Sequence, residues 1–338
     1  MGIKAYIAGC AGPQLTPEEK SFFSQDEPWG FILFARNIED PDQVRALTDS
    51  LREITGRHDT PILIDQEGGR VRRLRPPNWP DYPPGRALGE MYGRNAEAGL
   101  RAAWLHARLM AADLYALGIN VDCLPILDVP QADVHDVIGD RAYSPHPYEI
   151  VQIGRVVTDG LLAGGVLPIM KHIPGHGRAV ADSHLELPVV DTHPAILGCT
   201  DIYPFMQLAD LPMAMTAHII YSGFDAGHPA TQSQLVIERI IRGWIGFDGL
   251  LMSDDLSMQA LSGDYAQRTL SSFEAGCDIV LHCNGRMEEM SAIASVAPQL
   301  TGKSEHRARK ALDWLKVPDE NDLKALRAEF DELAMQAA

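Results

Sequence analysis

The stretch Gly165–His184 has the sequence GVLPIMKHIPGHGRAVADSH, and the fold is predicted from the pattern that it contains. Its first part, GVLPIM, is an apolar run typical of a strand that is buried on both faces. From Lys171 onward there are three histidines, a lysine, an arginine and an aspartate, with one proline and two glycines. Proline and glycine do not suit a helix interior or a central strand, so this part is predicted to be a loop. It is a catalytic loop, a metal site or a solvated loop in which the histidines have no role.

Other apolar runs of the same kind recur along the chain. The predicted strands are Ala5–Gly9, Gly30–Ala35, Pro61–Asp65, Val121–Leu127, Val166–Lys171, Ala214–Ile219, Leu250–Ser253 and Asp278–Leu281. Helical patterns lie between most of them, at Pro41–Ile54, Ala96–Leu117, Tyr148–Leu162, Ser233–Arg242 and Leu270–Ala275. This alternation predicts an α/β fold with a parallel sheet. Eight strands favour a TIM-type (β/α)₈ barrel. An open doubly wound sheet is the alternative, weakened because no GxGxxG turn follows the first strand.

The segment after Cys283 carries only helical patterns, at Met287–Val296, Arg307–Leu315 and Asn321–Met335. These segments are charged and rich in alanine and leucine, as expected of an outer covering. No linker, repeat or low-complexity segment divides the chain. We therefore expect residues 1–338 to form a single barrel domain, with C-terminal helices at about 285–338 packed on it.

Composition limits the class of protein. The 338 residues carry a formal net charge of −17, which argues against nonspecific binding to nucleic acid, because such binding depends on neutralising phosphates. The five cysteines are odd in number and show no CxxC spacing, which favours a reducing compartment. No signal peptide is evident, and the apolar run that ends at Met170 is too short to cross a bilayer. We expect a cytoplasmic monomer with no membrane or nucleic-acid partner.

Polar residues follow most of the predicted strands at the point where each strand ends. In a (β/α)₈ barrel the carboxyl ends of the strands form the active-site face, so these side chains are predicted to share one pocket. Such a pocket contains charges of both signs. The residues concerned are Asp65, Arg73, Asp128, Asp140, Arg141, Lys171, His172, His218, Asp254, Asp255 and His282.

A metal site is a less favoured interpretation of this pocket. His172 and His176 are four residues apart, but Pro174 and Gly175 lie between them, so the two rings do not share a helix face. The lysine and arginines in the same predicted pocket would repel a divalent ion. A phosphate site is also disfavoured, because no P-loop is present and several aspartates lie nearby.

The mixture of acids, cations and histidines suits carbohydrate chemistry. Sugar hydroxyls are bound by carboxylates, guanidinium groups and ammonium groups. Retaining cleavage of a glycosidic bond needs a carboxylate nucleophile and an acid/base group. Asp254 or Asp255 can supply the nucleophile, and His184, two residues after Asp182, can supply the acid/base. An ordinary loop turn with a capping aspartate is the alternative explanation of the Asp182-Ser183-His184 sequence.

Taken together, these motifs resemble glycoside hydrolase family 3, and most closely its short bacterial β-N-acetylhexosaminidases. The KHxPGHG motif followed by DSH is a specific signal, whereas SDD alone is weak. Ile173 stands where the motif usually has phenylalanine, a change that removes no reacting group. Many members carry a second α/β domain, for which the sequence after Cys283 is too short. The resemblance extends from the first strand to Met258, in IAGCAG, FILFARNIEDPDQV, LIDQEGGRVRRL, PILDV, VIGDRAYS, KHIPGHGRAVADSH and LLMSDDLSM.

The resemblance implies roles for individual residues. Asp254 would be the nucleophile and His184 the general acid/base, with Asp182 as its partner. The implied reaction is a double displacement through a covalent glycosyl-enzyme, with no metal or organic cofactor. The residues implied to bind the terminal N-acetylglucosamine are Asp65, Arg73, Arg141, Lys171 and His172.

The resemblance also implies a substrate and a place in the cell. The substrate would be N-acetylglucosaminyl-1,6-anhydro-N-acetylmuramic acid, with or without its peptide, in cytosolic recycling of peptidoglycan. Two alternatives stay open: a family 3 β-glycosidase for another sugar, and a non-catalytic sugar-binding barrel. Asp255 is predicted to be a helix-start or supporting residue beside the nucleophile.

Overall fold

The computed structural model describes residues 2–131, 137–179, 181–183 and 185–337. In this part of the chain nine parallel strands form one sheet, in the order β5-β4-β3-β2-β1-β11-β10-β8-β6. A separate two-stranded sheet contains β7 (Val189–Val190) and β9 (Ile220–Tyr221). The strands of the large sheet are β1 (Lys4–Gly9), β2 (Pro28–Leu33), β3 (Ile62–Ile64), β4 (Val121–Asp122), β5 (Leu167–Pro168), β6 (Met170–Ile173), β8 (Met213–Thr216), β10 (Leu250–Asp255) and β11 (Ile279–His282).

The predicted strand Val166–Lys171 divides into β5 and β6, and this division closes the sheet into a barrel. β5 pairs with β4 at one end of the sheet, while β6 pairs with β8 at the other end. The backbone of Lys171 joins the two ends, because its carbonyl accepts from the Leu127 N–H at 2.8 Å and its N–H donates to the Pro125 carbonyl at 3.1 Å. The strands therefore occupy eight positions around a barrel, and the predicted TIM-type (β/α)₈ fold is confirmed.

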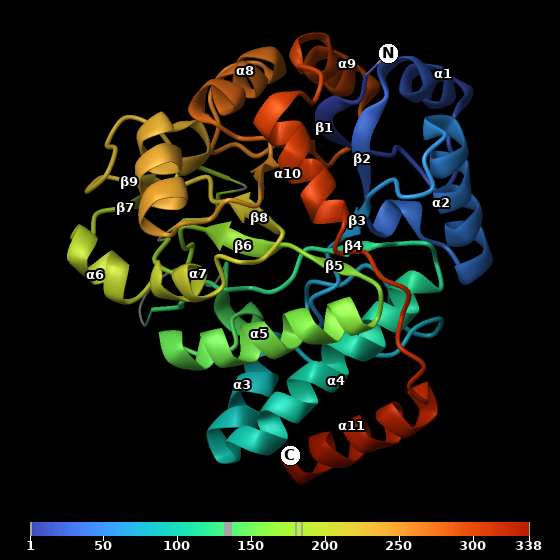
Figure 1. The fold of residues 1–338 in the computed structure, drawn as a ribbon, viewed down its shortest axis with the longest axis vertical. Helices are drawn as coiled ribbons and strands as arrows, with labels where there is room; N and C mark the ends of the chain where they lie inside the picture. The colour runs from blue at the N-terminus through green and yellow to red at the C-terminus, as the bar shows by residue number, and fades with distance from the viewer. Residues whose placement is uncertain (1, 132–136, 180, 184, 338) are drawn as a thin grey trace.

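Helices surround the barrel (Figure 1). The predicted helix Ser233–Arg242 is a π-helical segment, η4 (Val236–Trp244). Three short 3₁₀ segments are η1 (Ala35–Asn37), η2 (Gly139–Arg141) and η3 (Ala230–Gln232). The α-helices are α1 (Pro17–Asp26), α2 (Pro41–Thr55), α3 (Gly85–Arg94), α4 (Ala96–Tyr115), α5 (Pro147–Ala163), α6 (Pro194–Cys199), α7 (Tyr203–Gln207), α8 (Tyr265–Ala275), α9 (Met287–Val296), α10 (Gly302–Leu312) and α11 (Leu323–Ala337).

Local capping sets where some of these helices begin. Asp40 caps α2, because its side chain accepts from the backbone N–H groups of Asp42 and Gln43, both at 2.9 Å. Helix α8 begins earlier than the predicted Leu270. Asp264 and Gln267 form a reciprocal capping box there, which satisfies backbone N–H groups that would otherwise lack partners.

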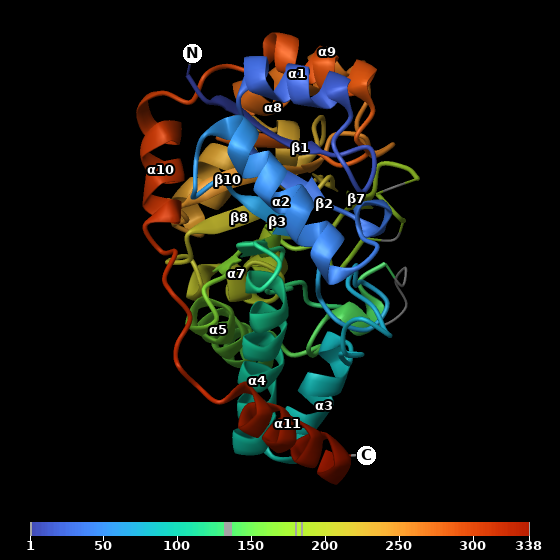
Figure 2. The same ribbon diagram turned by 90° about the vertical axis from the view of Figure 1, so that its right-hand side faces the viewer.

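The strands are buried on both faces, which explains why they appear in the sequence as continuous apolar runs. In β3, Leu63 belongs to the cluster inside the barrel, whereas Ile62 and Ile64 belong to the cluster beneath the surrounding helices. Helix α10 lies across the amino-terminal end of the barrel, where Ala308 and Ala311 join the inner cluster (Figure 2). The carboxyl ends of the strands are at the opposite end.

After Cys283 the chain forms the helices α9, α10 and α11. Helix α11 packs on α3 and α4 in both ribbon views (Figures 1 and 2). Arg108 of α4 pairs with Asp319 at 2.6 Å, and Arg101 forms a two-bond pair with Glu329, each bond 2.7 Å long. These contacts hold the C-terminal segment against α4, and α3 in turn packs against η2.

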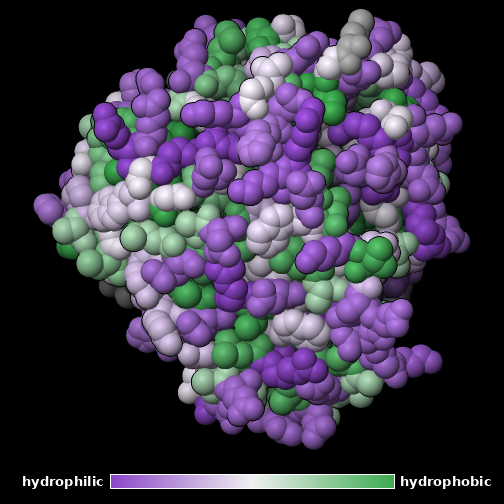
Figure 3. Space-filling view, viewed as in Figure 1, coloured by the Kyte–Doolittle hydropathy of each residue, from purple (hydrophilic) through white to green (hydrophobic). Residues whose placement is uncertain are grey.

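The face seen in Figure 3 is mostly hydrophilic, and apolar side chains gather over α6, where Ile196 is 51% exposed. Across the described residues, no helix combines the length and the apolar character needed to span a membrane.

The packing of α3 generates a test of the fold. A Cβ atom added to Gly89 would lie 1.6 Å from the Tyr143 carbonyl oxygen, so Gly89→Ala must displace the helix or the loop that follows η2. We expect the free energy of unfolding to fall by about 1–3 kcal/mol, measured by urea denaturation.

Gly93→Ala in the same helix is the matched control. No atom of the described residues lies within 4 Å of its added Cβ. The control should raise the free energy of unfolding by up to about 1 kcal/mol, because alanine favours a helix over glycine. Equal effects of the two substitutions would contradict this account of the packing.

Candidate active site

A cavity of about 560 Å³ opens at the carboxyl ends of the barrel strands. Seven of the eight predicted site residues line it, although they come from distant parts of the sequence. The eighth, His184, lies outside the described residues. The seven are Asp65, Arg73, Arg141, Lys171, His172, Asp182 and Asp254.

Of the eleven residues predicted at the strand ends, seven line the cavity, and Asp255 is the one among them that is not a predicted site residue. The other four, Asp128, Asp140, His218 and His282, are not part of its lining, because a polar residue after a strand can also be buried beside the pocket or lie on an outer loop.

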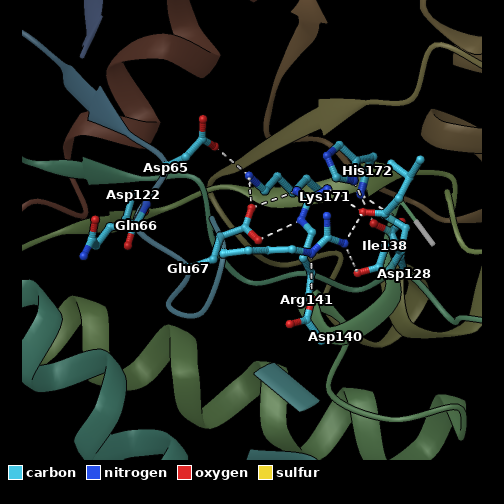
Figure 4. Close-up of polar contacts among 12 residues, drawn as sticks. Asp65, Gln66, Glu67, Asp122, Asp128, Ile138, Asp140, Arg141, Lys171 and His172 are labelled. Atoms are coloured by element: carbon cyan, nitrogen blue, oxygen red, sulfur yellow. Dashed lines mark hydrogen bonds and ion pairs between the residues drawn. The ribbon is translucent and has the colours of Figure 1, made fainter. Parts of the chain in front are cut away.

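A network of ion pairs lies beside the cavity, and its members Asp65, Arg141 and Lys171 line it (Figure 4). Lys171 Nζ lies 2.7 Å from Asp65 Oδ1 and 2.8 Å from Glu67 Oε1. Arg141 forms two hydrogen bonds to the Glu67 carboxylate, each 2.8 Å long. Figure 4 shows these side chains in a row, with Asp65 at one end and Arg141 at the other. Because an unpaired charge is costly at such a depth, each member depends on its neighbour.

The network keeps its members ionised. Burial would raise the pKa of the Asp65 carboxyl, but Lys171 and Arg73 hold that pKa well below its usual range. Burial acts on Glu67 in the same direction, and Arg141 and Lys171 outweigh it, so that the Glu67 pKa is about 2. Burial would lower the pKa of Lys171, but the two carboxylates raise it above its usual range. The cavity therefore presents full charges of both signs at neutral pH.

The loop after β3 folds back on itself, so that the Arg73 side chain lies beside Asp65 at the end of that strand. Its Nη2 donates to Asp65 Oδ2 at 2.9 Å, and its guanidinium lies 4.8 Å from the centroid of the Phe34 ring. The Gln66 side-chain oxygen accepts from the N–H groups of Arg73 and Leu74, at 2.9 and 3.0 Å, and so holds the loop in this course. We call the resulting set the charged cradle; it comprises Asp65, Glu67, Arg73, Arg141 and Lys171.

Another buried carboxylate, Asp128, contacts His172 of β6 and His176 of the loop that follows. Its Oδ2 lies 2.7 Å from His172 Nδ1, and its Oδ1 accepts from the backbone N–H groups of His172 at 3.1 Å and His176 at 2.7 Å. Burial would raise the pKa of Asp128, but the two histidines lower it to about 2. Asp128 thus fixes the His172 ring against the cavity.

The two carboxylates that end β10 have different surroundings. Asp255 Oδ1 accepts from the N–H groups of Ser257 at 3.0 Å and Cys283 at 3.1 Å, so it fastens the turn after β10 to the end of β11. Both residues line the cavity, and Asp254 Oδ1 accepts from the Asp255 N–H at 2.8 Å. Asp255 is the last residue of β10 and does not start a helix.

The loop after β6 brings Asp182 to the same cavity as Asp254. The Asp182 carbonyl accepts from the N–H groups of Leu185 at 2.9 Å and Glu186 at 3.0 Å, which forms a tight turn. Ser183, the next residue, also lines the cavity and is 2% exposed. Two segments far apart in the sequence therefore present carboxylates to one space.

Sequence reasoning missed part of this arrangement. It assigned no role to Glu67, and it named Asp128 only as a polar residue at a strand end. An acid two residues after Asp65, within the DQEGG motif, was the available signal for Glu67. Among the described residues, no group of three or more histidine, cysteine, aspartate or glutamate side chains is placed to hold a metal ion.

Known proteins share this sequence pattern and fold. Residues 11–312 match the family model described as the glycosyl hydrolase family 3 N-terminal domain. A β-hexosaminidase of Methylococcus capsulatus is 41% identical over 277 residues, which are 81% of this chain and 80% of that protein. A β-hexosaminidase of Chromobacterium violaceum is 37% identical over 335 residues, or 96% and 93% of the two chains.

Two solved structures have a fold similar to that of this chain. NagZ from Neisseria gonorrhoeae, in complex with N-trifluoroacetyl-D-glucosamine, superposes with a TM-score of 0.88 at 30% identity and covers 100% of this chain and 99% of its own. A glycoside hydrolase family 3 β-N-acetylglucosaminidase from Paenibacillus sp. superposes with a TM-score of 0.84 at 29% identity, over 98% of this chain and 66% of that one.

The buried His176 predicts a pH dependence of stability. Burial and the neighbouring His172 lower its pKa from 6.5 to about 4. The unfolded chain therefore binds this proton at a higher pH than the folded protein, and the free energy of unfolding falls as the pH drops from about 6.5 towards about 4. Between about pH 7 and about pH 5 this one residue should account for a loss of about 1–2 kcal/mol.

The measurement is urea denaturation of the wild type and of His176→Gln at both pH values. Glutamine does not titrate, so the loss of stability on acidification should be smaller in the variant by that amount. Identical losses in the two proteins would show that His176 is not held neutral.

Proposed function

The chain belongs to glycosyl hydrolase family 3, and on this premise we propose that it is a retaining β-N-acetylglucosaminidase that removes terminal non-reducing N-acetylglucosamine from peptidoglycan fragments. It is an enzyme of the β-hexosaminidase class. One observation carries the proposal: Asp254 at the end of β10 and Asp182 on the loop after β6 face the same cavity as the charged cradle.

In the proposed reaction the Asp254 carboxylate attacks the anomeric carbon while His184 protonates the departing oxygen. The bond from the anomeric carbon to that oxygen breaks, and a covalent glycosyl-enzyme ester forms. His184 then takes a proton from the water that releases the sugar. Asp182 orients the imidazole and favours its protonated form. An imidazole suits both steps, because it gains and loses a proton near neutral pH.

The charged cradle and His172 suit a ligand with several hydroxyl groups. Carboxylates accept hydrogen bonds while guanidinium and ammonium groups donate them, so a hydroxyl can be bound as donor and as acceptor. The cradle's charges already pair with one another, so they stay in place before a sugar arrives and little ordering is needed on binding. We assign Asp65, Arg73, Arg141, Lys171 and His172 to the terminal N-acetylglucosamine.

The proposed substrate is N-acetylglucosaminyl-1,6-anhydro-N-acetylmuramic acid, with or without its peptide, in cytoplasmic recycling of peptidoglycan. NagZ from Neisseria gonorrhoeae supports the choice of terminal sugar, since its solved complex holds a glucosamine with an acylated nitrogen. We also propose that the protein is a monomer and that residues 1–338 form one domain; the single domain is supported by the ion pairs of α4 with Glu329 of α11 and with Asp319, which precedes α11.

The choice of sugar is tested by comparing an aryl N-acetyl-β-glucosaminide with the matching aryl β-glucoside. We expect kcat/KM to be about a hundredfold or more higher for the N-acetylated substrate, because a site built for the acetamido group leaves polar atoms unpaired when that group is absent. Faster cleavage of the glucoside would favour a family 3 β-glycosidase for another sugar. Cleavage of neither substrate would favour a non-catalytic sugar-binding barrel.

The nucleophile is tested by mass spectrometry after incubation with a fluorinated N-acetylglucosamine substrate whose glycosyl-enzyme is hydrolysed slowly. We expect one sugar adduct, on the peptide that contains Asp254. Asp254→Asn should form no adduct and should lose about 10³-fold or more in kcat, because an amide is a poor nucleophile, while it still binds N-acetylglucosamine.

Asp255→Asn is the matched control for the adduct. It removes the neighbouring negative charge in the turn after β10 but leaves the proposed nucleophile in place, so the adduct should still form. An adduct on any peptide without Asp254 would overturn this assignment.

A further inference from the structure

Two buried side chains of the loop after β6 are joined to each other. His176 Nε2 lies 3.2 Å from Ser183 Oγ, and the two residues are seven positions apart in the sequence. They are 3% and 2% exposed, and both line the cavity. No step of the proposed reaction uses either side chain. Their contact therefore needs another explanation.

The His176 end of this contact is fixed to the barrel. The His176 backbone N–H donates to Asp128 Oδ1 at 2.7 Å, and its ring meets the His172 ring edge to face, with the centroids 5.4 Å apart. The Tyr221 hydroxyl donates to the carbonyl of the preceding residue, Gly175, at 2.7 Å. His176 therefore stands on a turn that is held from several sides.

Ser183 is where this fixed turn meets the rest of the loop. Its hydroxyl contacts His176, and its carbonyl accepts from the Ala260 N–H, at 3.2 Å. Ala260 belongs to the segment that follows β10. Asp182 and His184 are the covalent neighbours of Ser183, so any displacement of Ser183 must displace them as well.

The state of the His176 ring suits a structural contact. Burial and the neighbouring His172 lower its pKa to about 4, so the ring is neutral near pH 7. Within the part of the chain that the structure describes, its Nδ1 makes no hydrogen bond, so the ring is held through Nε2. A neutral ring can hold the serine without adding a positive charge to the loop.

We propose that the contact between His176 and Ser183 anchors the loop so that His184 and Asp182 meet the departing oxygen. This inference rests on the proposed function, in which His184 is the acid/base. His176 and Ser183 are positioning residues, since neither exchanges a proton with the substrate. Loss of the anchor should therefore weaken proton donation and leave the attack by Asp254 intact.

The experiment compares kcat/KM for two aryl N-acetyl-β-glucosaminides. The 2,4-dinitrophenyl group departs without a proton, whereas the phenyl group needs one. Because kcat/KM covers the steps up to formation of the glycosyl-enzyme, the ratio of the two values measures proton donation. The wild type gives the reference ratio, and His184→Ala gives the ratio for complete loss of the proposed acid.

We expect Ser183→Ala and His176→Leu each to lower kcat/KM for the phenyl substrate by about ten- to a hundredfold, and for the dinitrophenyl substrate by less than about threefold. The double variant should be no worse than either single variant, because both remove the same contact. His176→Gln should recover most of the loss, since its amide nitrogen can take the place of Nε2.

Ser272→Ala is the matched control for losing a buried serine hydroxyl. Ser272 lies on α8, is 0% exposed and donates to the Arg268 carbonyl at 2.8 Å. It is not part of the cavity lining, so the ratio of the two kcat/KM values should stay that of the wild type. If His176→Leu does not fold, Ser183→Ala and His176→Gln decide the question, because each keeps nearly the original volume.

Equal losses on both substrates in Ser183→Ala, or no loss on either, would overturn the anchor. A wild type that cleaves neither substrate would instead overturn the proposed function, so the two failures are distinguishable. A third result would also contradict the proposal. If Ser183→Ala lowers kcat/KM for the phenyl substrate but His176→Gln does not restore it relative to His176→Leu, the contact between Nε2 of His176 and the Ser183 hydroxyl is not the anchor.

Discussion

Lys171 contributes both to the closure of the barrel and to the active site, and its ammonium group is buried. Its backbone closes the barrel between β6 and the segment after β4, and its ammonium, 2% exposed, lies between Asp65 and Glu67. A buried cation of this kind is tolerated only while its carboxylates stay close, because removing one partner of such a pair costs about 3–5 kcal/mol. The ends of β3 and β6 therefore cannot separate without separating these charges. The geometry of the charged cradle is thus a condition of the stability of the barrel.

Burial and ion pairing also separate the residues that can bind the substrate from those that can transfer protons. Glu67, with a pKa of about 2, and Lys171, with a pKa raised above its usual range, stay ionised near neutral pH and can hold hydroxyl groups. They cannot exchange protons there. In the proposed reaction that exchange is left to the imidazole of His184, and the anchor at Ser183 places it. In this proposal the nucleophile belongs to the end of a strand and the acid belongs to a loop.

Much of the fold and of the site could be predicted from local pattern. All eight predicted strand positions are present, and the predicted site residues that are described share one cavity. The division of Val166–Lys171 into two strands was not predicted, because it depends on which neighbours the segment meets when the barrel closes. Glu67 was missed for a similar reason. Its importance comes from contacts with Lys171 and Arg141, which sequence spacing does not show.

Apolar periodicity, capping residues and polar strand ends are local properties, so the chain's order of residues was enough to predict an α/β barrel, one charged pocket and a family resemblance. Tertiary structure decided the rest: which charges pair, which of Asp254 and Asp255 is bound into the turn, and how Ser183 meets His176. Those outcomes depend on distances of a few ångströms between separate strand ends and loops. Only the closed barrel sets such distances, because it alone brings those segments to a common face and buries their charges together.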